Sequence, residues 1–298
     1  MAAKNSANGL LTHLVIGLGK LLAMLPIPVL LFLGKGLGYL FWWFAHDRRH
    51  ITLTNLRLCF PDKTEQEIQA LAKDSIINMG LAFTEMMQAY WGNPEKVLPY
   101  GTIEGMEHIQ AAQLKERGVL LVGIHFSSID ICGQLLAKNL SVDSVYRPHN
   151  NPVLDQAILE GRQRYAKNCI KRSDIRSMIR QLKNQRIVWY APDQDFGRKV
   201  SVFAPFFGVP TATLTITARL AKATNCMVIP VIHCRTQDNK GYLVRFLPPL
   251  ENYPSGDDVT DATTLNKTIE QMIMQKPADY MWVHRRFKTR PEGSPSVY

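Results

Sequence analysis

An uninterrupted apolar run over residues 119–124 is followed at once by His125 and, five residues later, by Asp130. The run has the length of a strand and contains no polar residue, which is typical of a strand buried on both faces of a sheet. Ligands of open α/β sheets bind outside the carboxyl ends of the strands. The sequence therefore predicts an α/β fold with His125 and Asp130 at the ligand-binding edge of its sheet.

Strand-like and helical patterns alternate over residues 100–285, and we find no linker or repeat within them. This alternation predicts a single α/β domain over residues 46–298, with a central mixed sheet flanked by helices. A capping box at Thr64 and Glu67 predicts a helix that continues toward Tyr90. The further predicted strands cover residues 143–146, 187–191, 226–232, 241–247 and 279–283, a helix is predicted over 212–223, and residues 202–208 show neither period.

The spacing of His125 and Asp130 limits how they can meet. Five residues along an ideal helix turn the chain by about 500°, so the two side chains cannot share one helix face. They meet if His125 ends the strand and Asp130 lies in the first turn of the next helix. Asp130 would then accept a hydrogen bond from one imidazole nitrogen and leave the other free to take a proton, as in a general base. The alternative is a core histidine beside a helix-capping aspartate.

Arginines follow the predicted strand over residues 143–146. Arg147 comes directly after it, and Arg162 and Arg164 lie in the helical segment beyond. Guanidinium groups bind phosphate oxygens bidentately, so this cluster is a candidate phosphate site. The alternative is a solvated basic helix face.

Two carboxylates follow the predicted strand over residues 187–191. Asp193 and Asp195 stand two residues apart, just before Gly197. Such a pair can ligate a divalent metal through oxygen, orient substrate hydroxyls, or cap its own loop at the glycine turn. Ser127 and Ser128 are possible nucleophiles, but no second base accompanies them.

The apolar segment over residues 11–45 predicts a membrane anchor. Between Lys20 and Lys35 the uncharged run is 14 residues long, whereas a spanning helix needs about 20. Aromatic residues at 41–44 with cations directly beyond are typical of a membrane interface. We predict a loose polar N-terminus over residues 1–10, then one hydrophobic helix kinked by prolines, with the body on the cytoplasmic side because the cations follow the helix. The alternative is a helical hairpin buried in a soluble core.

The chain is basic, with 35 Lys and Arg against 25 Asp and Glu, a net charge of +10. Such a balance suits nucleic acid, an anionic membrane or an acidic partner. No nucleic-acid-binding motif accompanies the charge, so we do not expect nucleic acid as a partner. The five cysteines are scattered without a C-x2-C pair, which predicts reduced thiols rather than disulfides or a zinc site.

The block HFSSID resembles the H-x4-D/E block of the glycerolipid and lysophospholipid acyltransferase superfamily. Six blocks resemble, in the same order, the late acyltransferases of lipid A biosynthesis, and the lauroyl-transferring members most. Members with the most similar blocks often carry Glu at the position of Asp130. The blocks are GMEHI (105–109), RGVLLVGIHF (117–126), VYRPHNNP (145–152), VWYAPDQDFG (188–197), SVFAPFFG (201–208) and YMWVHRRFKTRPEG (280–293).

The resemblance implies an O-acyltransferase at the cytoplasmic face of the inner membrane, in contact with membrane phospholipid. It implies transfer of a fatty acyl group, laurate, from acyl carrier protein to a hydroxyl of an acyl chain on the Kdo-modified lipid A precursor. No metal is expected, because the family is not known to need one, and no cofactor is expected, because the donor is an already activated thioester. The roles it implies are a general base for His125, its orientation by Asp130, phosphate binding for Arg147, Arg162 and Arg164, and shaping of the acceptor pocket for Asp193, Asp195 and Gly197.

Two other classes of function remain open from the residues alone. A metal-dependent transferase or hydrolase would use His125, Asp130, Asp193 and Asp195 as ligands and would lose activity on chelation. A non-catalytic, membrane-anchored binder of anionic lipid would use the basic surface alone and would tolerate loss of His125.

Overall fold

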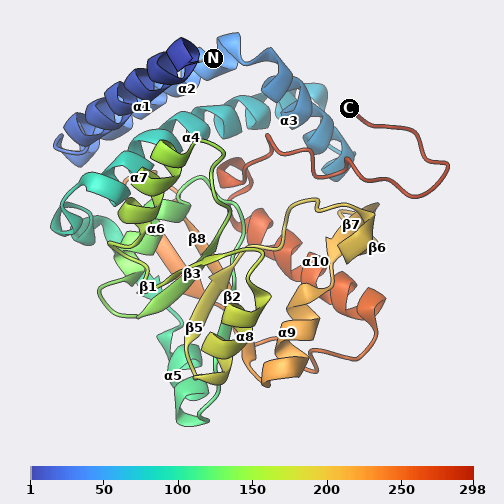
Figure 1. Cartoon of the computed structure of the whole chain (residues 1–298). Helices are drawn as coiled ribbons and strands as arrows, with labels where there is room; N and C mark the ends of the chain where they lie inside the picture. The colour runs from blue at the N-terminus through green and yellow to red at the C-terminus, as the bar shows by residue number, and fades with distance from the viewer. Residues whose placement is uncertain (1) are drawn as a thin grey trace.

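The computed structural model describes residues 2–298, and its centre is a mixed sheet (Figure 1). Strands β8, β2, β5, β3 and β4 are parallel, whereas β9 runs antiparallel to β8 and pairs in parallel with β1. The predicted α/β domain with a mixed sheet is therefore confirmed. In spatial order the strands are β1 (Gly101–Glu104), β9 (Tyr242–Phe246), β8 (Met227–Arg235), β2 (Val119–Val122), β5 (Ile187–Tyr190), β3 (Val142–Tyr146) and β4 (Cys169–Lys171).

Strand β2 lies in the middle of this sheet and is buried on both faces, as its sequence predicts. Leu120 and Val122 enter one apolar core, while Val119 and Leu121 enter the other. The first core is closed by helices α8 (Ile175–Lys183), α9 (Ile216–Thr224) and α10 (Asp258–Gln275). The second is closed by α5 (Met106–Leu114), α6 (Ile129–Leu136) and the end of the long helix α4 (Glu65–Trp91), which begins at the predicted capping box.

Residues 202–208, whose sequence shows neither helical nor strand periodicity, belong to a β-hairpin. Strands β6 (Ser201–Phe206) and β7 (Val209–Leu214) pair antiparallel. Phe207 and Gly208 between them both have positive φ, 47° and 76°, as a tight two-residue turn requires. The helix predicted over residues 212–223 is wrong at its start, because residues up to Leu214 continue the hairpin.

The strand predicted over residues 279–283 is also wrong. A short 3-10 helix, η4 (Pro277–Asp279), occupies its start, and Tyr280 makes one isolated bridge to Phe126. No lateral position beside β2 is free for another strand, because β5 and β8 already pair with its two edges.

The predicted single anchor is two helices, α1 (Ala2–Leu22) and α2 (Ile27–Phe44), which precede α3 (His46–Cys59). Pro26 caps α2, and a proline stands in its first turn, where a missing N–H costs no hydrogen bond. The prolines therefore start a second helix rather than kink one. Helix α1 also covers most of the segment predicted to be loose, and Met1 lies outside the described residues.

Helices α1 and α2 run along the outer side of α4, away from the sheet (Figure 1). By length and composition, α2 is the one helix in the described part of the chain that is able to cross a membrane. Helix α7 (Pro152–Arg162) lies on the same side of the molecule, beside α4 and α1.

Candidate active site

His125 and Asp193 meet at the carboxyl ends of two neighbouring strands. Val122 of β2 is paired with Tyr190 of β5 in parallel register, and the two site residues each stand three positions further on. The His125 ring Nδ1 lies 2.7 Å from Asp193 Oδ1, and its backbone N–H donates to Oδ2 at 3.0 Å. The sheet register thus aligns the two residues, although 68 positions separate them in the chain.

The electrostatics of this pair define which ring nitrogen is free. Burial of Asp193 raises its pKa, but attraction to His125 and the hydrogen bonds from the His125 ring and backbone hold that pKa below its usual range. The ionised carboxylate accepts the Nδ1 proton, which leaves the Nε2 lone pair available. The His125 side chain is 27% exposed, whereas that of Asp193 is 1% exposed.

The predicted partner of His125, Asp130, lies elsewhere, and the expected orientation of His125 by Asp130 is wrong. Asp130 Oδ1 accepts from the hydroxyls of Tyr165 at 2.6 Å and Tyr90 at 3.1 Å, and lies 3.4 Å from Arg162 Nε. Asp130 does stand in the first turn of α6, as predicted. Its side chain points toward α4 and α7, and Asp193 already occupies the ring nitrogen that Asp130 was expected to fix.

Two further histidines surround His125, and the sequence analysis assigned no role to either. The ring of His284 lies 5.6 Å from that of His125, and its Nε2 is 3.0 Å from Gln194 Nε2. His233 is buried against Phe126. Burial and the nearby His125 lower the pKa of both His284 and His233 to about 4, so both rings are neutral near pH 7.

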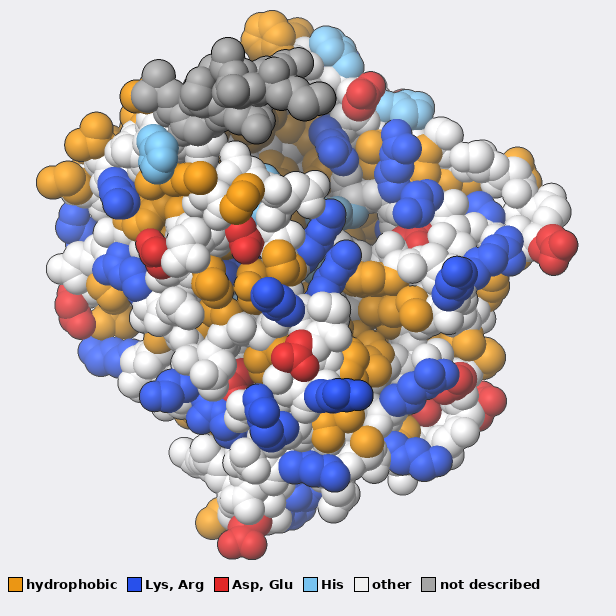
Figure 2. Space-filling view, in the orientation of Figure 1, with side chains coloured by type: hydrophobic (Ala, Val, Ile, Leu, Met, Phe, Trp, Pro, Cys, Tyr) orange, Lys and Arg blue, Asp and Glu red, His pale blue; other side chains and the backbone are white. Residues whose placement is uncertain are grey.

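His125 opens into a pocket of about 460 Å³. Apolar side chains from β3, α8, β5 and the segment around α9 form much of its wall, including Val145, Met178, Trp189 and Leu214. Four exposed cations also line it and come from four separate segments: Arg147, Arg172, Lys199 and Arg219. The space-filling view shows Lys and Arg side chains spread widely over one face of the molecule (Figure 2).

Of the three predicted phosphate-binding arginines, the structure brings only Arg147 into this pocket. Arg162 donates to the Tyr90 hydroxyl at 3.1 Å and pairs with Asp130. Arg164 donates to the backbone carbonyls of Tyr90 and Gly92, at 2.7 and 2.9 Å. Arg162 and Arg164 therefore bind α7 to the end of α4, while Arg172, Lys199 and Arg219 join Arg147 instead.

Asp195 and Gly197 form the loop rather than a metal pair. Asp195 accepts from the Gly197 backbone N–H at 2.8 Å and from the Thr289 N–H and hydroxyl at 2.6 and 2.8 Å. Gly197 has a φ of 84°, which favours glycine. Asp195 thus fixes its own turn and holds the C-terminal segment beside the site. Within residues 2–298, no group of three His, Cys, Asp or Glu side chains is arranged to hold a metal ion.

The two serines after His125 are held as structural hydrogen-bonding groups. Ser127 Oγ accepts from Arg235 Nη1 at 2.8 Å, and Ser128 Oγ donates to the His233 carbonyl at 3.0 Å. Both are buried. Within the described residues, neither hydroxyl is hydrogen-bonded to His125, so a nucleophilic serine has no base here.

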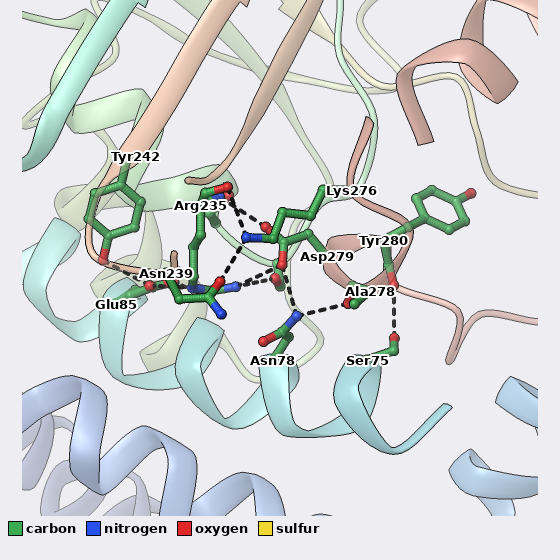
Figure 3. A network of polar contacts seen from close by, with 12 residues as sticks. Ser75, Asn78, Glu85, Arg235, Asn239, Tyr242, Lys276, Ala278, Asp279 and Tyr280 are labelled. Atoms are coloured by element: carbon green, nitrogen blue, oxygen red, sulfur yellow. Dashed lines mark hydrogen bonds and ion pairs between the residues drawn. The ribbon is translucent and has the colours of Figure 1, made fainter. Parts of the chain in front are cut away.

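A buried ion-pair network supports the loop that carries His125 (Figure 3). Arg235 of β8 pairs with Glu85 of α4 and with Asp279, and all three side chains are at most 3% exposed. The Asp279 carbonyl accepts from the Ser127 N–H at 2.7 Å, and the His125 carbonyl accepts from the Met281 N–H at 2.9 Å. The network thus connects β8, α4 and η4 directly to the loop around His125.

Comparison with known proteins places this chain in a family. The sequence model described as bacterial lipid A biosynthesis acyltransferase matches residues 5–289. The chain belongs to this family. It is 41% identical over 289 residues to the lipid A biosynthesis lauroyltransferase of Escherichia coli (strain K12), covering 97% of this chain and 94% of the relative.

Two further members of the family show the same breadth of similarity. The palmitoleoyltransferase of Escherichia coli (strain K12) is 37% identical, with 97% of this chain and 94% of the relative covered. The myristoyltransferase of the same strain is 28% identical over 273 residues, covering 91% and 83%. The resemblance seen in the six sequence blocks is therefore confirmed at the level of the family.

Proposed function

We propose that this lipid A biosynthesis acyltransferase moves a fatty acyl group from the thioester of acyl carrier protein to a hydroxyl on an acyl chain of the Kdo-modified lipid A precursor. The observation that carries the proposal is His125, held by a buried, ionised Asp193 at the edge of an apolar pocket lined with cations. Laurate is the preferred donor chain, because the relative with 41% identity is a lauroyltransferase.

His125 acts as the general base in this mechanism. Its Nε2 takes the proton of the acceptor hydroxyl as the oxygen attacks the thioester carbonyl. The C–S bond breaks, an ester forms, and the proton passes from Nε2 to the departing thiolate. Asp193 keeps the proton on Nδ1 and stabilises the imidazolium that forms. No acyl-enzyme intermediate is required, and the site contributes chiefly alignment of two bound substrates.

The four cations of the pocket bind phosphate groups. Arg147 receives phosphates of the acceptor, joined by Arg172, Lys199 and Arg219. The guanidinium of Arg172 lies 5.3 Å above the Phe196 ring, which restrains it near the pocket. The apolar wall holds hydrocarbon, so headgroup charge and acyl chain are accommodated in one cavity.

The partners and location follow from the same assignment. Acyl carrier protein is the donor partner, the lipid A precursor is the acceptor, and phospholipid contacts the apolar N-terminal helices. We place the enzyme at the inner membrane with His125 on the cytoplasmic side, and we expect it to need neither metal nor cofactor.

The test is acyl transfer from lauroyl acyl carrier protein to the Kdo-modified precursor in detergent. Wild type, His125→Ala and wild type with excess chelator are compared in parallel. Activity that survives the chelator and is lost in the variant supports the proposal. Inactive wild type, a fully active variant, or loss of activity on chelation would contradict it.

A further inference from the structure

We propose that helices α1 and α2 attach the protein to one leaflet of a bilayer, lying in its plane, and that neither helix crosses it. The N-terminal helix and the His125 pocket then face the same compartment. The inference rests on the membrane location proposed above, but it concerns how the chain enters the lipid.

The two helices share an exposed apolar surface. On α1, Leu14, Leu18 and Leu21 recur at helical spacing and are 59–64% exposed. On α2, Phe32 and Trp43 are 76% and 64% exposed. Exposed apolar side chains gathered on two helices in this way are unfavourable in water and mark a membrane or protein contact.

The opposite face of α2 is fixed to α4 at backbone distance. A Cβ on Gly80 of α4 would lie 2.2 Å from the Gly38 nitrogen, and one on Gly38 would lie 2.5 Å from the Ile77 carbonyl oxygen. Gly34 makes the same close approach to α4, four residues before Gly38. Small residues at this spacing let two helix backbones touch. Helix α2 therefore has one apolar face on the protein and only the other available to lipid.

Helix α1 makes its own contacts with α7 and with the end of α4. Asn151 Nδ2, at the start of α7, donates to Thr12 Oγ1 at 3.0 Å. A Cβ on Gly19 would lie 2.4 Å from the Trp91 ring. Helix α1, which precedes α2, and helix α3, which follows it, both contact α4, so both ends of α2 are held on one body. A spanning α2 would carry α1 across the bilayer and separate Thr12 from Asn151.

The length of α2 does not decide whether this helix spans the bilayer, but the charges on the neighbouring helix α4 do. Eighteen residues at 1.5 Å each give about 27 Å, close to the thickness of the hydrocarbon core. A spanning α2 docked as described would bring α4 to the same depth. Helix α4 carries Lys73, whose Nζ lies 5.6 Å above the Tyr39 ring of α2, and the exposed Asp74. Charged groups at that depth are costly.

Lipid is the occupant that the flanking charges favour. Exposed Lys20 and Lys35 border the apolar surface, and His46, Arg48 and Arg49 follow the aromatic end of α2. Cations beside an apolar, Trp-containing helix complement anionic headgroups. A protein partner would not require this arrangement.

The first test is the side of the membrane on which two introduced cysteines react. His13→Cys in α1 and Asp47→Cys in α3 are made separately in a Cys169→Ser background, because the four other native cysteines are buried. A membrane-impermeant maleimide is added to intact spheroplasts and to inverted inner-membrane vesicles. We expect both sites to react only in the inverted vesicles. Reaction of His13→Cys in intact spheroplasts, with Asp47→Cys protected, would show a spanning α2 and overturn the proposal.

A second variant keeps the test decisive if His13→Cys resists the reagent in both preparations. Thr12→Cys with Asn151→Cys should form a disulfide when native membranes are treated with copper–phenanthroline as oxidant, and the cross-linked enzyme should remain active. Active enzyme that never cross-links in membranes would contradict the in-plane arrangement. Labelling is read independently of acyl transfer, so an inactive protein with the expected labelling contradicts only the proposed function.

Vesicles containing anionic phospholipid test whether lipid covers the exposed apolar side chains of α1 and α2. Phe32→Ser with Trp43→Ser should lower co-sedimentation of purified protein about tenfold. Leu114→Ser is the matched control, because Leu114 is 86% exposed on the remote helix α5. Equal binding by both variants, or wild-type protein found in the soluble fraction of cells, would contradict lipid as the occupant.

Discussion

Two buried charge arrangements lie side by side in this molecule, and they differ in what they leave unsatisfied. In the Arg235 network the guanidinium donates to Glu85, Asp279 and Ser127, all buried. In the His125 site, Asp193 is equally buried, but one ring nitrogen of His125 remains free at a pocket. A network whose groups all bond to protein holds a fold together. A pair that keeps one basic atom available can move a proton.

Loss of the free nitrogen should give the largest effect on activity, and a smaller loss of stability than breaking the Arg235 network. We expect His125→Ala to reduce kcat by a factor of about 10²–10⁴, because proton removal from the acceptor loses its base. The variant should still fold, because the backbone N–H at position 125 continues to donate to Asp193 Oδ2, although the buried carboxylate loses its ring partner. His108→Ala, on α5, is the control for histidine removal. A variant with normal kcat, or one that loses activity only by unfolding, would contradict the difference proposed here between the His125 site and the Arg235 network.

Breaking the Arg235 network should give the opposite result. Arg235→Met leaves Glu85 and Asp279 buried without their cation, and loss of one partner of a buried pair costs about 3–5 kcal/mol. Chemical unfolding in detergent measures this loss. Arg245→Met is the matched control, because Arg245 pairs with Glu104 at 2.6 Å with both side chains about 40% exposed, and exposed pairs contribute about 0–1 kcal/mol. Equal effects of the two substitutions would contradict the structural role of the network.

Acid should destabilise the site region before it neutralises the carboxylates. His284 and His233 have pKa values lowered to about 4 from an ordinary 6.5. Between these values the unfolded chain binds more protons than the folded one, so the free energy of unfolding falls as the pH drops through this window. Each pKa unit corresponds to about 1.4 kcal/mol per group. The lowered pKa of Asp193 acts at lower pH, as its ordinary value is 3.8.

The measurement for this prediction is the unfolding midpoint at several pH values from 7 to 4.5. His284→Gln should flatten part of the slope. A midpoint that does not change over this range would show that neither histidine is held neutral by burial.

The sequence predicted what depends on local patterns. The apolar run of β2, the position of His125 at its end and the capping box of α4 need only neighbouring residues. The pairing of His125 was beyond such patterns, because Asp193 reaches it through the parallel register of β2 and β5. Sequence spacing favoured Asp130 because it is close to His125 in the chain. The sheet instead places Asp193 beside His125 in space.

The same limit explains three other errors. Prolines in an apolar segment indicate a break, but only the contacts with α4 show that two helices result. The segment after η4 has a strand-like composition, yet both edges of β2 are already paired. Arg162 and Arg164 form a basic cluster in sequence, and their protein acceptors become visible only when α7 lies against α4.

The measurement that tests the central claim most directly is the steady-state acyl transfer rate of Asp193→Asn, taken together with its melting temperature. The amide has the shape of the carboxylate, but it cannot stabilise the imidazolium and offers an N–H to Nδ1, which favours the wrong tautomer. We predict a fall in kcat of about 10²–10⁴ with KM little changed and the fold intact. A folded Asp193→Asn enzyme with near wild-type kcat would contradict the assignment of Asp193 as the residue that orients the base.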